Sequence, residues 1–327
     1  MSNDGRPHRA PARRLAATMT AAVALTGLLA GCGSSAGTTP GSVGKRDGGL
    51  HVVTSFYPLQ FVATRIGGPD ATVSSLTRPG AEPHDLELTP RDVAAVQQAD
   101  LVVYLGGFQP AVDQAVDQHA GRDALDVAAA AHLDVHTSGS DDHTGEAGDH
   151  VGEEAVDPHF WLDPTRLATV SQQVAEAMAK ADPDAAAAFR QRATALAGDL
   201  SALDDAFRVG LAHCASTDLV TSHTAFGYLA QRYGLHQVGI TGLSPEAEPD
   251  PRSLAAVATF VREHHVSTIY SETLVSPAVA RTVARETGAT TAVLDPIEGL
   301  TDASAGRDYL EVMRSNLAVL KKGQSCS

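Results

Sequence analysis

Short runs of β-branched and aliphatic residues alternate along this chain with longer stretches in which apolar residues recur at helical spacing. In the first half, the pattern predicts strands over residues 52–55, 71–76 and 101–105, and helices that begin near Pro58 and at Pro90 behind Thr89 as N-cap. In the second half, it predicts strands over residues 218–221, 236–240, 266–270 and 291–294, and helices that open at Pro251 and Pro277. Because strands that alternate with helices form parallel sheets, we expect an α/β fold with two such sheets, each flanked by helices.

Two Ala-rich segments lie between these regions. They run from Asp163 to Lys180 and from Asp182 to about Gly210, and Gly198 is the only glycine before that end. Both are predicted to be helices, the second up to ~40 Å long at 1.5 Å per residue. A helix of that length can act as a rigid strut between two lobes, and it can equally be a packing helix of the second lobe.

The N-terminus resembles a secretory signal. Four Arg and one Asp occur within the first 14 residues, and Leu15–Gly31 then carries no charge. The run ends in Leu29-Ala30-Gly31-Cys32, which resembles the bacterial lipobox and predicts lipidation of Cys32. A plain signal peptide and an uncleaved anchor are the alternatives, and Arg13-Arg14 leaves both Sec and twin-arginine export open. We therefore expect an exported protein that is lipid-anchored to the outer face of the cytoplasmic membrane.

These patterns divide the chain into five parts. They are a lipoprotein signal peptide (1–31), a Gly/Ser/Thr-rich flexible tether (32–49), an N-terminal lobe (50–162), connecting helices (163–212) and a C-terminal lobe (213–327).

The charge excludes one class of partner. The formal net charge is −15, and it becomes −18 once residues 1–31 are removed, whereas nucleic-acid binding needs a clustered cationic surface. Aromatic residues make up only 5% of the chain, so aliphatic side chains must fill the core. The sequence carries no signal for an oligomer, and we expect a monomer.

Two cysteines remain besides Cys32. Cys214 and Cys326 form an even pair, which in an oxidising exported compartment indicates a disulfide. Two unrelated thiols are the alternative.

The segment from His132 to Glu154 breaks the strand and helix pattern. Acidic residues and glycines surround its histidines, and it has almost no apolar side chain, so it is predicted to be a solvated loop. We expect these histidines to collect metal weakly, because nothing fixes their mutual geometry. The four are His132, His136, His143 and His150.

Four motifs place potential metal ligands where strands or turns lead into helices. His84 lies in Glu82-Pro83-His84, and His159 lies in Asp157-Pro158-His159-Phe160-Trp161. His223 follows the strand at 218–221, and Asp295 follows the strand at 291–294. In α/β sheets, ligands bind beyond the carboxyl ends of the strands. Three imidazoles and one carboxylate suit tetrahedral Zn²⁺, whereas Mn²⁺ favours a larger share of oxygen ligands.

From residue 52 to about residue 320, the order of these motifs resembles the zinc and manganese solute-binding lipoproteins of bacterial ABC uptake systems. The resemblance implies that His84, His159, His223 and Asp295 bind the metal, and that an ABC permease of a zinc uptake system is the partner. A His at position 223, where manganese binders often carry Glu, and the His-rich insertion between the first two motifs both resemble the zinc branch. A manganese binder of the same type is the alternative.

Other functions fit the sequence less well. A zinc hydrolase needs an open coordination position and a general base, and the chain has neither a His-Glu-x-x-His helix nor a Gly-x-Ser-x-Gly elbow. A binder of organic ligands would need a larger, more aromatic cleft. Glu272 ends another strand, and we expect it to support a ligand rather than to bind the metal itself.

Overall fold

The computed structural model describes residues 49–120, 123–137 and 155–327. Its first sheet is parallel, with strand order β2-β1-β3-β4. The strands are β1 (Leu50–Thr54), β2 (Ala71–Ser75), β3 (Leu101–Tyr104) and β4 (Ala124–Asp126). Successive residues of a strand face opposite sides of its sheet, so Val52 packs against α1 (Tyr57–Gly67) and the long helices, whereas Val53 packs with α2 (Pro90–Gln98) and α3 (Pro110–His119).

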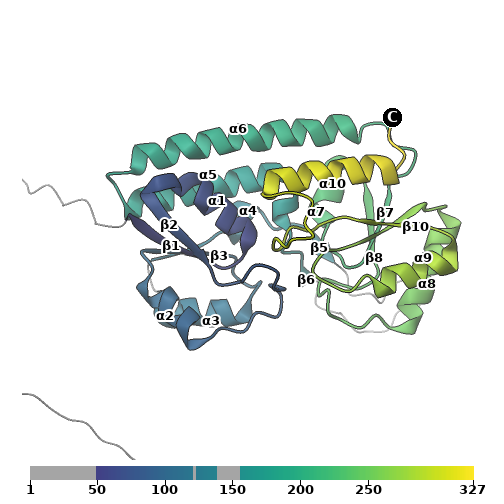
Figure 1. The fold of residues 1–327 in the computed structure, drawn as a ribbon, viewed down its shortest axis with the longest axis horizontal. Helices are drawn as coiled ribbons and strands as arrows, with labels where there is room; N and C mark the ends of the chain where they lie inside the picture. The colour runs from purple at the N-terminus through teal and green to yellow at the C-terminus, as the bar shows by residue number, and fades with distance from the viewer. Residues whose placement is uncertain (1–48, 121–122, 138–154) are drawn as a thin grey trace, which may run out of the picture. The chain divides into compact units, whose positions relative to one another are not determined.

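The second sheet repeats this arrangement with strand order β10-β9-β7-β8, again parallel. The strands are β7 (Asp218–Thr221), β8 (His236–Gly239), β9 (Thr268–Ser271) and β10 (Thr290–Val293). Its helices are α7 (Gly227–Tyr233), α8 (Pro251–Glu263), α9 (Ala278–Thr287) and α10 (Tyr309–Gly323). The two parallel sheets flanked by helices confirm the predicted fold class (Figure 1).

Helices α5 (Pro164–Ala181) and α6 (Ala186–Gly210) connect the two sheets. The Asp163 side chain caps α5 by accepting from the Thr165 N–H at 2.8 Å. Helix α6 begins at Ala186, four residues after the predicted start at Asp182, because residues 183–185 form a turn.

Helix α6 contacts both halves of the fold, in agreement with the predicted strut. It packs against α1 on one side and α10 on the other, and Figure 1 shows it running along both. Arg192 of α6 donates to the Gly67 carbonyl at the end of α1, and Asp204 of α6 forms an ion pair with Arg232 of α7 at 2.6 Å. The two sheets and these helices belong to one compact unit, so the lobe boundaries at residues 162 and 212 stay a prediction.

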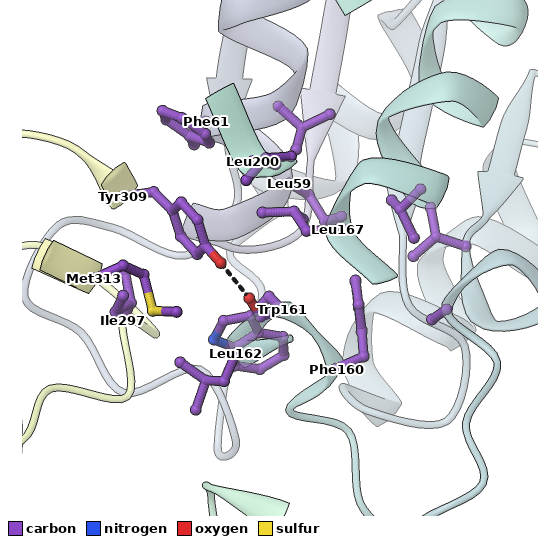
Figure 2. Packing of buried hydrophobic residues seen from close by; sticks show 14 of the residues in the cluster. Leu59, Phe61, Phe160, Trp161, Leu162, Leu167, Leu200, Ile297, Tyr309 and Met313 are labelled. Atoms are coloured by element: carbon purple, nitrogen blue, oxygen red, sulfur yellow. Dashed lines mark hydrogen bonds between the residues drawn. The ribbon is translucent and has the colours of Figure 1, made fainter. Parts of the chain in front are cut away.

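The only tryptophan lies in the core. Trp161 is fully buried, its ring lies 5.0 Å from that of Phe56, and its backbone carbonyl accepts from the Tyr309 hydroxyl at 2.5 Å (Figure 2). Tyr309 belongs to α10, so this contact ties the second half of the chain to the motif that carries His159.

The structure corrects one predicted loop in part. His136–Thr137 (β5) pairs in antiparallel fashion with Ala155–Val156 (β6). A short two-stranded ribbon thus forms at the two ends of the His-rich insertion, residues 132–154. His143, His150, Cys32, the signal segment and the tether lie outside the described residues. Within the described ranges, no helix is both long enough and apolar enough to cross a membrane.

The predicted disulfide between Cys214 and Cys326 is confirmed. It joins the segment after α6 to the chain end, where the two residues also form an antiparallel bridge.

Removing this disulfide should destabilise the fold. The cysteines are 112 residues apart in sequence, and for a loop of that length the chain-entropy account gives about 4 to 5 kcal/mol. We expect the Cys214→Ser, Cys326→Ser double variant to unfold at a lower urea concentration than the oxidised protein, and to match the reduced wild type. An unchanged midpoint would show that the cross-link contributes nothing.

Candidate metal centre

Three imidazoles and one carboxylate from both halves of the chain converge on one buried point. They are His84, His159, His223 and Glu298, and one ligand atom of each lies within 4.8 Å of the others. His84 and His159 come from the half that holds the first sheet, and His223 and Glu298 from the half that holds the second. The predicted three-imidazole cluster is therefore present in the structure.

The spacing of these atoms suits a small tetrahedral ion. His84 Nε2 lies 3.2 Å from His159 Nε2 and 3.1 Å from Glu298 Oε1. Glu298 Oε1 lies 3.0 Å from His159 Nε2 and 3.4 Å from His223 Nε2, and the two last imidazoles are 3.4 Å apart. Four ligands at Zn distances of about 2.0 to 2.1 Å on a tetrahedron are roughly 3.3 to 3.4 Å from one another. The cage therefore needs little adjustment to hold zinc.

His84 lies in a turn that is held in place by the segment between β3 and α3. Gln109 donates to the Pro83 carbonyl at 3.0 Å, and the Glu82 carboxylate accepts from the His84 N–H at 3.0 Å. The Phe108 ring meets the His84 ring edge-on at 4.8 Å. These contacts fix the backbone and the ring of His84 together.

His159 is oriented by its own motif. The Asp157 carboxylate lies 2.7 Å from His159 Nδ1 and also accepts from the His159 N–H at 2.9 Å. A carboxylate on Nδ1 directs Nε2 toward the metal position. Both side chains are completely buried, so water does not compete for the contact that orients the His159 ring.

His223 is oriented in the same way from a neighbouring strand. Glu272, at the end of β9, lies 2.7 Å from His223 Nδ1 and accepts from the His223 N–H at 3.0 Å. Glu272 does not belong to the four converging groups, in agreement with the expectation that it supports a ligand.

The expectation for Asp295 is wrong in this structure, because the carboxylate in the cage belongs to Glu298. Asp295 instead accepts from the Ile297 N–H at 2.8 Å and so closes the turn that follows β10. Ile297 adopts a left-handed backbone with φ of 59°, which is unusual for a β-branched residue and which carries Glu298 inward. Trp161 Nε1 donates to the Pro296 carbonyl at 2.7 Å and holds this turn against the His159 motif.

The sequence contained only a weak signal for Glu298. It lies three residues after Asp295 and precedes Gly299, but nothing in the pattern shows that the chain reverses at Ile297.

Burial and charge shift the pKa of each group in the cage. Burial lowers the pKa of His84. Burial also opposes protonation of His223, but the carboxylates of Glu272 and Glu298 outweigh it and raise the pKa of His223 to about 10. Burial favours the neutral form of Glu298, yet hydrogen bonds from the three imidazoles hold its pKa well below the usual range. Burial likewise opposes protonation of His159, but the carboxylates of Asp157 and Glu298 outweigh it and raise its pKa, so the cage pairs one carboxylate with imidazoles that favour protonation.

The partly exposed carboxylate of Glu82 also borders the cage. Burial, followed by repulsion from Glu298, raises the pKa of Glu82 to about 8, and its Oε1 lies 4.0 Å from His84 Nε2.

Solvent approaches the cage from the side of His84. The His84 side chain is 11% exposed, whereas the other three are at most 1% exposed. A cavity of about 900 Å³ leads to His84. Phe108 lines this cavity together with His132 and Asp134 of the His-rich insertion. His136 is exposed on β5 and does not line this cavity.

Known proteins share both the sequence and the architecture. The family described as "Zinc-uptake complex component A periplasmic" matches residues 52–323. The high-affinity zinc uptake system protein ZnuA of Bacillus subtilis (strain 168) is 38% identical over 298 residues, which cover 90% of this chain and 93% of that protein.

Solved structures show the same likeness. Zn(II)-bound AdcA from Streptococcus pneumoniae has a TM-score of 0.70 and 34% identity, over 85% of this chain and 58% of AdcA. The laminin-binding protein Lbp of Streptococcus pyogenes also has a TM-score of 0.70, with 31% identity over 84% of this chain and 100% of Lbp. By the extent of the match, this chain belongs to the zinc-uptake complex component A family.

Proposed function

We propose that the protein captures Zn²⁺ outside the cytoplasm and delivers it to an ABC permease for high-affinity zinc uptake. The observation that carries this proposal is the convergence of His84, His159, His223 and Glu298 at the spacing of a tetrahedral ion. Zinc is the cargo, so the protein binds and releases it without a chemical step. Four protein donors already complete the usual coordination of zinc, and an enzyme would keep one position open for water.

The remaining assignments follow from this role. Lipidation at Cys32 would hold the protein at the membrane that contains the permease, and residues 32–49 would give it reach. The C-terminal and N-terminal lobes would each supply two ligands, so that release requires only a small separation of the two pairs. Three nitrogen donors favour zinc over manganese, which prefers more oxygen ligands.

A pair of matched amide substitutions tests the site. Glu298→Gln removes the charge that faces the ion, and we expect zinc affinity to fall by more than the roughly 10- to 100-fold that is typical of losing an outer-shell partner. Asp295→Asn keeps an oxygen that can accept from the Ile297 N–H, so zinc affinity should be unchanged. Competition against a chromophoric chelator measures both, with manganese titrated in parallel. If Asp295→Asn lowered zinc affinity and Glu298→Gln did not, the fourth ligand would be Asp295 and not Glu298.

Zinc binding should release protons at pH 7. His223 has a pKa of about 10, so its imidazole is protonated before the metal arrives, and zinc must displace the proton from Nε2. Affinity should therefore rise as pH increases from 7 toward 10. Titration calorimetry in buffers of different ionisation enthalpy gives the number of protons released.

The Glu272→Gln variant is the control for this measurement. It keeps the shape at His223 Nδ1 but loses a carboxylate that raises the pKa of His223, so fewer protons should leave. Zinc binding by the wild type without any proton release would contradict the proposed state of the cage.

We also propose that the His-rich insertion collects zinc weakly beside the cage, since His132 lies in the wall of the cavity that leads to His84. Deleting residues 137 to 152 should leave one tight zinc and remove weaker equivalents. Loss of the tight equivalent in calorimetry would mean that the insertion supplies a primary ligand.

A further inference from the structure

A second cluster of side chains that can bind metal lies in the second sheet, at the end of the strands that is opposite to the cage. Asp218 is the first residue of β7, whereas His223 follows the far end of the same strand. Asp218 Oδ1 lies 3.0 Å from His236 Nδ1, and Asp218 Oδ2 lies 3.0 Å from His264 Nδ1. One carboxylate is thus placed between two imidazoles.

Three structural elements fix this arrangement. Asp218 and His236 are register partners in the parallel pair of β7 and β8. His264 ends α8, and its ring stacks on Phe260 at 3.9 Å between centroids and 20° between planes. The Phe260 ring also lies 5.8 Å from the His236 ring, so one aromatic side chain orders both imidazoles.

The surroundings favour a cation. The Asp218 side chain is only 19% exposed, and in the described part of the chain it forms no ion pair with Lys or Arg. The cluster also lies at the C-terminal end of α8, a helix of 13 residues, where the helix dipole favours positive charge.

We propose that Asp218, His236 and His264 form a second, surface site for a divalent transition metal. Two imidazole nitrogens and one carboxylate oxygen suit Zn²⁺, Cu²⁺ or Ni²⁺, with water completing the coordination. When Nδ1 binds the metal, each neutral ring carries its single proton on Nε2, and both rings rotate toward one ion. The side chains of His236 and His264 are 63% and 45% exposed, which leaves room for both imidazole rings to rotate. Because it is open to solvent, this site is weaker than the buried cage and exchanges its metal more readily.

Crystals of the full protein, loaded with one equivalent of zinc and then equilibrated with excess zinc chloride, test the proposal. Anomalous scattering at the zinc edge should show a second peak within ligand distance of Asp218 and both imidazoles. In solution, the His236→Gln, His264→Gln double variant should bind one weak zinc equivalent fewer than the wild type, and keep the tight one.

His213→Gln is the matched control, because His213 is an exposed histidine of the same half of the chain and lies outside the cluster. It should retain every equivalent of the wild type. The proposal is overturned if excess zinc gives no peak between the three side chains and the double variant binds as many equivalents as the wild type.

Discussion

The fold must bring a buried carboxylate and three imidazoles from two separate sheets to within hydrogen-bonding distance of one another. Glu298 Oε1 lies 3.0 to 3.4 Å from all three Nε2 atoms, in a space that solvent reaches only beside His84. Imidazole lone pairs that face one another at this distance repel unless a proton or a metal lies between them. The cage therefore favours a cation, and the packing around it holds the four groups close together.

Each ligand is held by a contact that belongs to a different part of the fold. Asp157 and Glu272 fix the imidazoles of His159 and His223 through Nδ1, so the ring orientation does not depend on the metal. Trp161 joins the His159 motif to the turn that carries Glu298, through the Pro296 carbonyl. The same tryptophan packs in the core, which couples the geometry of the cage to the stability of the fold.

The long helices limit how far the two halves can move apart. Helix α6 is bound to α1 through Arg192 and to α7 through Asp204, so a hinge between the sheets would have to break contacts at both ends. Small rearrangements of the loops around the cage are then the easier way to release an ion. Glu82, whose pKa is raised to about 8 by burial and by repulsion from Glu298, lies beside His84 on the side of the cage that solvent reaches.

Local signals in the sequence predicted most of the fold. Thr89 is the N-cap of α2 as predicted, where it forms a capping box with Asp92, and the strand at Asp218–Thr221 ends where expected. Helix α10, which begins at Tyr309 behind its N-cap Asp308, was not predicted, and neither was α3, although Pro110 opens it.

The fourth ligand could not be predicted in the same way. Glu298, rather than Asp295, reaches the cage because the backbone at Ile297 is left-handed. The Ile297 side chain is buried, so this conformation depends on tertiary contacts that no local sequence pattern encodes.

X-ray absorption at the zinc edge, on protein that carries one equivalent of zinc, tests the central claim most directly. Four ligands at about 2.0 to 2.1 Å, with multiple scattering from three imidazoles, are the predicted result. A shell of five or six mainly oxygen ligands, or scattering from fewer than three imidazoles, would contradict a cage formed by His84, His159, His223 and Glu298.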